Sequence, residues 1–320
     1  MSGSTLSIPL IDISGFDSGD PAACDAIVAA VGAASEEYGF MRLTGHGVPG
    51  ATVDDLFTEG RAFFAQPEDM KLAIRDQAAN RGYVPMFDQV FPGEKPAGQE
   101  SFSMGHPVPP ADESLRDLPF YKPAPWPDAP GFRPAMLGVY NAMFHVGETV
   151  LSAMALYLGR EADFFTGALK DSYSNMRVIH YPAPDAIADV TDFGSRPHED
   201  RGLIALLIQD GNGGLDVKGA DGEWIGVEPD QTTVICNVGR LLRRWTNNRY
   251  TSAIHRVVNC SGRSRQSIPL FVHPGFNQVI DAADLAAPGE KVKFDPVIAG
   301  PFTYEDFAMQ RPSWKVNAAE

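Results

Sequence analysis

The hydrophobic pattern of this chain changes character near residue 173. Before that point apolar residues recur at helical spacing, and the longest such stripe follows Leu137, Tyr140, Phe144, Leu151, Met154 and Leu158. After it, short apolar and β-branched runs are separated by turn-forming clusters such as Asp210–Gly214. A mainly helical first half followed by a strand-rich second half predicts an α+β fold, with the strands forming an antiparallel sandwich or barrel. The predicted strands are Arg177–Tyr181, Leu203–Gln209, Thr232–Asn237, Ile254–Asn259 and Ser267–Val272.

The first half also predicts individual elements. Asp20 followed by Pro21 is a typical helix start, and the helix should end at Gly39. Residues 81–134 are rich in Pro, Gly and aromatic residues and predict a long irregular excursion of the kind that forms binding loops or lids. The remaining expected elements are strands at Ser7–Asp12, Phe40–Leu43 and Ser101–Met104, a helix at Val53–Phe64, and a long helix around the Leu137–Leu158 stripe.

Charge and composition exclude several classes of partner. The chain has 26 Lys and Arg against 41 Asp and Glu, for a net charge of −15, which disfavours binding to nucleic acid or to anionic membranes. Its three cysteines form no Cys-x-x-Cys pair, and no run of eighteen apolar residues occurs. The N-terminus lacks a basic region followed by an apolar stretch, so we expect a cytoplasmic protein.

One group of residues has the types and spacing of a metal site. His198 and Asp200 lie two positions apart just before a predicted strand, so an extended backbone places both side chains on one face. His255 lies in another predicted strand, and a barrel can bring distant strands together. Two imidazoles and one carboxylate make the facial triad of non-haem Fe(II) oxygenases, which leaves coordination positions open. By itself His-x-Asp is common by chance, and the same ligands would also suit a zinc hydrolase.

A second pair of residues is suited to binding a carboxylate. Arg265 and Ser267 are again two positions apart, and they follow His255 after a turn at Asn259–Gly262. A guanidinium beside a hydroxyl can hold a carboxylate through two hydrogen bonds. Taken alone, Arg265 could equally be a surface arginine, because Arg256 and Arg263 lie nearby.

Taken in order, these motifs resemble the 2-oxoglutarate/Fe(II)-dependent dioxygenase superfamily, in its isopenicillin N synthase-like branch. The resemblance covers nearly the whole chain and rests on the combination of motifs. In the second half they are His198–Asp200, Leu206–Asp210, Gly213–Leu215, Gly222–Ile225, Trp245–Asn247, His255–Val258 and Arg265–Pro269. In the first half they are Ile8–Asp12, Tyr38–Phe40, Gly45–Pro49 and Glu100–Gly105.

The resemblance implies a double-stranded β-helix, or jelly roll, with helices packed around it. It implies one domain over residues 1–320, with a helical region carrying substrate loops at 1–172, the jelly-roll core with the metal site at 173–280, and a C-terminal extension at 281–320. His198, Asp200 and His255 would be the catalytic Fe(II) ligands. The co-substrate 2-oxoglutarate would be bound by Arg265, Ser267 and Tyr181.

Three positions depart from the usual pattern of this family. Glu199 replaces a Thr or Ser and should point away from the metal. Ile179 replaces an Asn and removes one polar contact to the co-substrate. Arg240 replaces an Asp, with an effect that the sequence does not define. None of these changes removes a metal ligand.

The implied reaction uses O2 and 2-oxoglutarate to hydroxylate, desaturate or cyclise a small organic molecule. Phe102, Met104 and Phe276 are candidate substrate contacts; if the face of Phe102 and Met104 points outward, Ser101 and Ser103 face the site instead. Two other functions stay open at this point. One is an oxidase like isopenicillin N synthase, which uses no 2-oxoglutarate, and the other is a non-catalytic ligand sensor on the same fold. The sequence does not indicate an oligomeric state.

Overall fold

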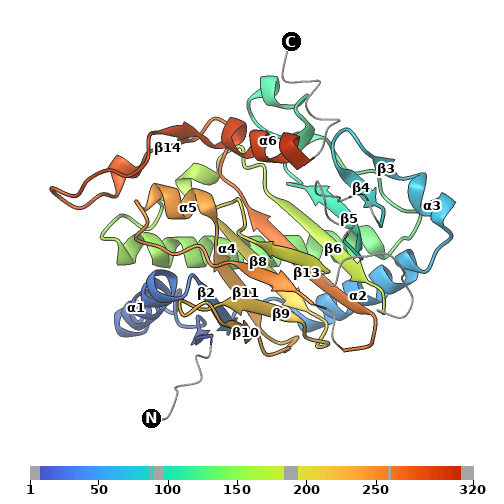
Figure 1. Ribbon diagram of the computed structural model, residues 1–320, viewed down its shortest axis with the longest axis horizontal. Coiled ribbons are helices and arrows are strands. Elements are labelled where there is room, and N and C mark those ends of the chain that lie inside the picture. The colour runs from blue at the N-terminus through green and yellow to red at the C-terminus, as the bar shows by residue number, and fades with distance from the viewer. Residues whose placement is uncertain (1–7, 87, 89–96, 184–193, 259–260, 311–320) are drawn as a thin grey trace.

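A large, nine-stranded sheet forms the centre of the protein (Figure 1). The computed structural model describes residues 8–86, 88, 97–183, 194–258 and 261–310. The strand order is β1-β2-β11-β8-β13-β6-β5-β4-β3, and every neighbouring pair is antiparallel except β1 and β2. The strands are β1 Leu10–Asp12, β2 Phe40–Thr44, β3 Arg75–Asp76, β4 Arg81–Val84, β5 Glu100–Gly105, β6 Asn175–Tyr181, β8 Ile204–Gln209, β11 Val234–Val238 and β13 Arg265–Val272.

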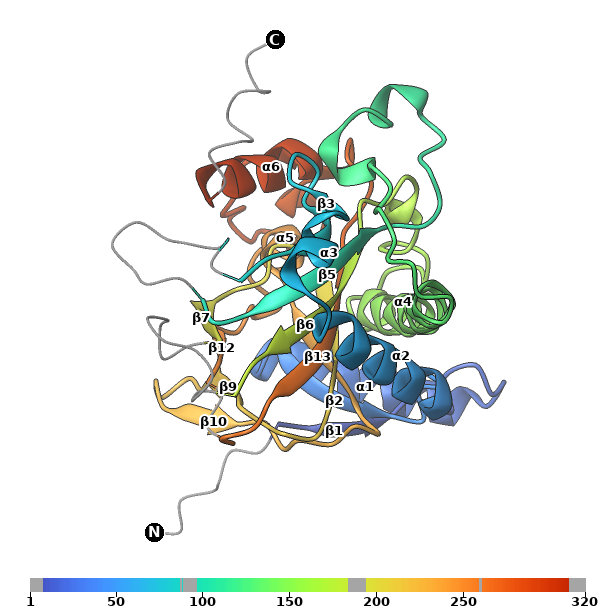
Figure 2. The same ribbon diagram turned by 90° about the vertical axis from the view of Figure 1, so that its right-hand side faces the viewer.

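A second sheet of four strands lies against one face of the large sheet (Figure 2). Its order is β10-β9-β12-β7, and all three pairs are antiparallel. Ile179 and Tyr181 of the large sheet share a buried apolar cluster with Val217 and Val257 of the small sheet. Two facing, mainly antiparallel sheets with this cluster between them match the expected jelly roll. The strands are β7 Ser195–His198, β9 Leu215–Lys218, β10 Trp224–Gly226 and β12 His255–Val257, and a separate pair is β14 Val279–Ile280 with β15 Val297–Ile298.

Helices cover the opposite face of the large sheet, where α1, α2 and α4 lie side by side (Figure 2). The buried stripe of α4 includes Val139, Met143 and Val150. At Gly147 an added Cβ would lie 3.3 Å from Val272, so this glycine marks a close approach of α4 to β13. The helices are α1 Pro21–Glu37, α2 Gly50–Phe64, α3 Glu68–Leu72, α4 Phe132–Tyr157, α5 Arg240–Trp245 and α6 Ala299–Gln310, with short 3₁₀ helices at Glu113–Leu115, Pro119–Tyr121, Gly167–Leu169 and Ala282–Asp284.

Most of the predicted elements are confirmed over the described residues, and the α+β class with them. Ser7, Asn259 and the end of the predicted C-terminal extension, 311–320, lie outside the described residues. The Asp20 side chain accepts a hydrogen bond from the Ala22 N–H at 3.0 Å and caps α1 as expected. The excursion at 81–134 was predicted with one strand, and this is wrong because β4 pairs with β5 there. Gly82 has a positive φ of 69° inside β4, which breaks the strand signal in the sequence. Within the described part of the chain, no helix is long and apolar enough to span a membrane.

Candidate metal and co-substrate site

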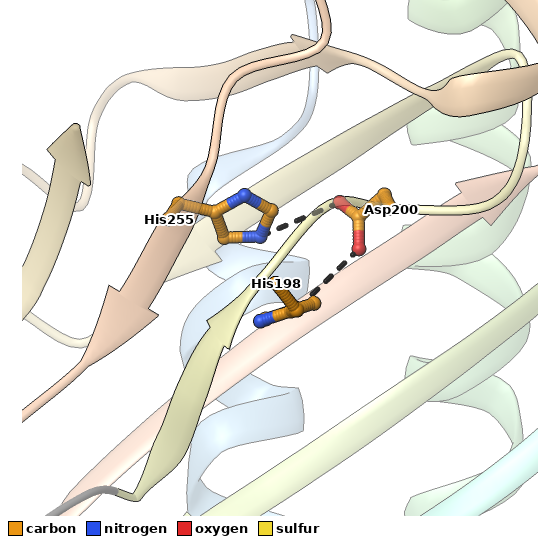
Figure 3. Close-up of side chains that lie close together, drawn as sticks. All are labelled: His198, Asp200 and His255. Carbon is orange, nitrogen blue, oxygen red and sulfur yellow. Dashed lines mark ion pairs between the residues drawn. The ribbon is translucent and has the colours of Figure 1, made fainter. Parts of the chain in front are cut away.

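The three predicted metal ligands meet at one point (Figure 3). His198 ends β7, Asp200 follows two residues later, and His255 begins β12. His198 and His255 are paired across the small sheet, and their ring centroids are 4.3 Å apart. The Asp200 carboxylate lies 3.6 Å from the Nε2 atom of each imidazole. One ligand atom from each residue lies within 4.8 Å of the others, which is the spacing needed to surround a single metal ion.

Backbone carbonyls orient both imidazoles. Nδ1 of His198 lies 2.7 Å from the Arg196 carbonyl oxygen, and Nδ1 of His255 lies 3.2 Å from the carbonyl oxygen of Ala253. Because a carbonyl oxygen only accepts hydrogen bonds, these contacts place the ring proton on Nδ1. The unprotonated Nε2 atoms are therefore available to a metal, and the carbonyls act as the outer support typical of metal-binding histidines.

Asp200 is held by its surroundings as well as by the histidines. The Asn237 amide on β11 donates to its carboxylate at 2.8 Å, and the backbone N–H of Arg240 donates to its carbonyl at 2.8 Å. Behind it, Gly202 and Gly239 lie back to back, because a Cβ on Gly239 would come within 2.2 Å of the Gly202 carbonyl oxygen. The large sheet thereby fixes a ligand that the loop after β7 supplies.

Protonation in the site favours metal binding. Burial alone would raise the pKa of Asp200, but His255, His198 and the Asn237 amide outweigh it and hold that pKa below its usual value. Burial, followed by the neighbouring His198, lowers the pKa of His255 to about 4. At neutral pH the pair is a carboxylate and a neutral imidazole, the forms that bind metals. Glu199 points away, as expected, and pairs with Arg243 of α5 at 2.7 Å.

Arg265 on β13 is a fully buried cation. Its Nε donates to the Gly213 carbonyl at 2.7 Å, and its Nη2 donates to the Gln209 side chain at 3.0 Å. Its guanidinium stands 4.7 Å from the centre of the Tyr181 ring. Nη1 is buried and has no hydrogen-bond partner among the described residues. The two acceptors that Arg265 has in the described part of the chain are neutral. A buried guanidinium with such partners and a spare donor fits the carboxylate of a ligand.

Sheet register places Ser267 and Tyr181 beside Arg265. Arg265 is paired with Tyr181 on β6, and Ser267 two residues on is paired with Ile179 and with Gln209. Ser267 therefore shares a face with Arg265, on the side of the large sheet where Ile179 and Tyr181 meet the small sheet. The structure brings together all three residues expected at the co-substrate.

The three predicted substrate contacts lie elsewhere. The Phe102 ring packs on Phe63 of α2 and Phe132 of α4, so its face of β5 points to the helices. Met104 shares that face and belongs to the same core. The prediction that Phe102 and Met104 contact the substrate is therefore wrong, and Ser101 and Ser103 lie on the inner face instead. A period of two fixes which residues share a face but not which way the face points.

Phe276 is also placed away from the triad. Its ring packs against Phe120 and Tyr173. It lines a cavity of about 620 Å³ whose other walls include Asp76, Lys122 and Tyr304. None of the three candidate metal ligands lines this cavity.

Two residues that support the candidate site were not predicted from the sequence. Asn237 and Gln209 each stand at the end of an apolar run, where they bind Asp200 and Arg265 respectively. A polar residue directly after a buried apolar run was the available signal, but the partners of Asn237 and Gln209 depend on which strands are neighbours in the sheet.

Comparisons with known proteins agree over nearly the whole chain. A family model described as non-haem dioxygenase in morphine synthesis N-terminal matches residues 8–129, and one described as 2OG-Fe(II) oxygenase superfamily matches residues 173–274. The 2-oxoglutarate-Fe(II) type oxidoreductase hxnY of Emericella nidulans is 34% identical over 90% of this chain and 86% of its own length. The 2-oxoglutarate-dependent dioxygenase citB of Monascus ruber is 33% identical over 84% of this chain and 85% of its own length.

Solved structures show the same fold. A full-length Neurospora crassa protein, crystallised in complex with alpha-KG, has a TM-score of 0.83 and 27% identity, over 96% of this chain and 98% of the other. A 2OG-Fe(II) oxygenase family protein from Caulobacter crescentus also has a TM-score of 0.83, at 28% identity over 94% and 98% of the two chains. The paired histidines with Asp200, the buried Arg265 and these similarities agree, and the chain belongs to the 2-oxoglutarate/Fe(II) oxygenase superfamily.

Proposed function

We propose that this protein is a non-haem Fe(II)- and 2-oxoglutarate-dependent dioxygenase that oxidises a small organic molecule by hydroxylation, desaturation or cyclisation. For hydroxylation the balance is R–H, O2 and 2-oxoglutarate giving R–OH, succinate and CO2. The observation that carries the proposal is the joint presence of a three-ligand metal site and the buried, incompletely paired Arg265 guanidinium.

The residues present fit both groups. His198, Asp200 and His255 would hold Fe(II), and three protein ligands leave positions for other ligands. Arg265 and Ser267 would bind the distal carboxylate of 2-oxoglutarate, with the Tyr181 ring against the guanidinium. Bound Fe(II) would activate O2, which is the oxidant, and the oxidation of 2-oxoglutarate to succinate and CO2 would supply two of the electrons that reduce O2. The chain positions the reactants and excludes water.

Other functions explain fewer of these features. A zinc hydrolase would use the triad but leave Arg265 without a role. A ligand sensor would need no metal ligands. An oxidase without 2-oxoglutarate would use Arg265 for its substrate, yet similar proteins are named as 2-oxoglutarate-dependent, and the similar Neurospora crassa structure is a complex with alpha-KG. Assignment to the isopenicillin N synthase-like branch, a single domain over 1–320 and a cytoplasmic location stay predictions.

Succinate release tests the proposal directly. Purified protein with Fe(II), 2-oxoglutarate and O2 is screened against a set of small metabolites, and mass spectrometry then follows the compounds that stimulate succinate formation. We expect stimulated succinate release together with a product that has gained one oxygen or lost two hydrogens. Oxidised product without succinate would favour the oxidase, and metal-dependent hydrolysis without O2 would favour the zinc enzyme.

A further inference from the structure

Strand β5 presents two serines to the side of the sheet that faces away from the helices. Because Phe102 packs against α2 and α4, its neighbour Ser103 points to the opposite face. On β6 the same alternation applies. An added Cβ on Gly60 of α2 would meet Val178 at 3.2 Å, so Arg177 and Ile179 point away from α2. Ile179 belongs to the apolar cluster shared with the small sheet, which identifies this as the face of the metal site.

On that face Ser103 and Arg177 are immediate neighbours. They are register partners across β5 and β6, and side chains at paired positions start about 5 Å apart. Arg177 is 8% exposed and Ser103 is fully buried. The Ser103 hydroxyl makes no hydrogen bond to any described residue. A buried hydroxyl left unsatisfied costs about 1–3 kcal/mol, and a ligand that accepts its proton would remove that cost.

The strand register also places Ser103 and Arg177 at nearly the same level as the candidate metal site in the direction of the strands. Asn237, which holds Asp200, is paired with Ala205, Ala205 with Phe271, and Phe271 with Asn175. Arg177 is the next residue on this face of β6 after Asn175. Three strand spacings separate its strand from that of Asn237, about 14 Å, and an arginine side chain reaches across part of this distance.

Arg177 and Arg265 lie at different positions along the strands. Arg265 is paired with Tyr181, four residues further along β6, which corresponds to about 13 Å along the strand. One small dicarboxylate that also reaches the metal does not need both guanidinium groups. If Arg265 holds the co-substrate, Arg177 is placed for the other reactant.

We propose that Arg177 and Ser103 bind a carboxylate of the substrate, so that the molecule oxidised is a small organic acid. This inference rests on the proposed function and names the substrate class of the same site. A buried guanidinium with a neighbouring hydroxyl donor recognises a planar anion better than a neutral carbonyl, because hydrogen bonds to a charged acceptor are stronger. The carboxylate fixes one end of the substrate and leaves the other end for the metal.

Equilibrium binding tests this without turnover. The protein, loaded with Fe(II) and 2-oxoglutarate under anaerobic conditions, is titrated calorimetrically with benzoate, phenylacetate, 3-phenylpropionate and hexanoate, each beside its primary amide. We expect at least one acid to bind about tenfold or more tightly than its amide. Arg177→Gln should remove this preference, Arg177→Lys should restore part of it, and Ser103→Ala should weaken acid binding by about threefold to tenfold. Equal binding of every acid and amide by the unmodified protein would overturn the proposal.

Two controls separate the possible causes of failure. Arg249→Gln removes an arginine that pairs with Glu36 of α1, and it should leave acid binding unchanged. Affinity for 2-oxoglutarate is measured in Arg177→Gln as well; a loss as large as that in Arg265→Ala would assign Arg177 to the co-substrate and overturn the inference. If the unmodified protein never releases succinate, the proposed function fails, while the acid-to-amide comparison still decides the substrate class.

Discussion

Arg265 is the residue that we propose binds the distal carboxylate of 2-oxoglutarate. Its Nε and Nη2 atoms are fixed by Gly213 and Gln209, and the Tyr181 ring supports the guanidinium, so Nη1 is held in place before any ligand arrives. A donor fixed in advance loses little conformational entropy when a carboxylate binds.

Replacing Arg265 should therefore affect 2-oxoglutarate far more than iron. We expect Arg265→Ala to raise the KM for 2-oxoglutarate by about tenfold to a hundredfold, because hydrogen bonds to a charged group contribute about 1.5–3 kcal/mol. Arg265→Lys should recover little, since lysine lacks the planar fork. Anaerobic titration with Fe(II) should give the same metal affinity in all three proteins. An unchanged KM in Arg265→Ala would remove this residue from the co-substrate site.

His198→Ala should abolish substrate-coupled succinate formation, because one of the three proposed metal ligands would be lost. Metal analysis after gel filtration under anaerobic conditions should show little retained iron. Thr246→Ala serves as a control at a buried residue that contacts none of the ligands in the described hydrogen bonds. If His198→Ala still couples succinate release to substrate oxidation, the ligand assignment is wrong.

The sequence could predict which three residues form the candidate metal site, but not every contact around them. His198 and Asp200 lie two apart on an extended segment, and this spacing alone places both on one face. Phe102 and Met104 share a face in the same way, yet whether that face meets helices or the metal depends on the packing of α2 and α4. Asn237 needed the neighbour relation of β11 and β8, which no local pattern contains.

At the scale of elements, a buried polar network connects α3, β4, β5 and β6 on the helical side of the sheet. Glu100 is 4% exposed and accepts hydrogen bonds from Lys71 at 2.7 Å and Tyr83 at 2.7 Å, and it contacts Nδ1 of His180 at 2.8 Å. The other ring nitrogen of His180 lies 2.9 Å from the Ser264 hydroxyl, next to Arg265. This network joins the edge strands of the large sheet to the start of β13.

Glu100→Gln should destabilise the protein at neutral pH. Removing one partner of a buried ion pair leaves Lys71 without its closest counter-charge, at a cost of about 3 kcal/mol in the free energy of unfolding. Urea unfolding at pH 7 measures this difference. The exposed change Glu113→Gln, which affects a surface pair with Arg116, should alter the same quantity by less than about 0.5 kcal/mol.

The effect of Glu100→Gln should also depend on pH. Burial would raise the pKa of Glu100, but hydrogen bonds from His180, Lys71 and Tyr83 outweigh burial and lower it. A carboxyl whose folded-state pKa is lowered stabilises the fold above its unfolded-state pKa, near 4.3, and loses this contribution as the pH falls further. The stability gap between the two proteins should thus narrow below about pH 4. A gap that widens on acidification would contradict this role for the charge.

Elements were easier to predict than their partners. The helix beginning at Pro21 has a cap and an apolar stripe, which are local signals, and α1 follows them closely. Strand β4 has only four residues and a glycine with positive φ, so its strand conformation depends on pairing with β5.

At the scale of the molecule, the candidate site joins the two sheets. His198 and His255 belong to the small sheet, whereas Asn237 and Arg265 belong to the large one. A metal bound by the triad, with a co-substrate reaching Arg265, would cross-link the two sheets through non-covalent bonds.

Binding of Fe(II) and 2-oxoglutarate should therefore stabilise the whole fold. Fe(II) with 2-oxoglutarate, each at about a hundred times its dissociation constant, should raise the anaerobic melting temperature, since each ligand at that ratio adds about 2.7 kcal/mol. The two ligands together should shift it more than Fe(II) alone. His198→Ala should show almost no shift with either addition, and a full shift in that variant would place the ligands elsewhere.

The back-to-back glycines behind Asp200 have a consequence for how this protein can vary. A methyl group on Gly239 would overlap the Gly202 carbonyl, and one on Gly202 would come within 2.5 Å of the Val272 carbonyl oxygen. In a saturation library screened only for soluble expression, substitutions at the three proposed metal ligands should survive, while those at Gly202 and Gly239 are depleted. Related proteins that have lost oxygenase activity could therefore lose His198 and His255 long before they lose Gly202 and Gly239.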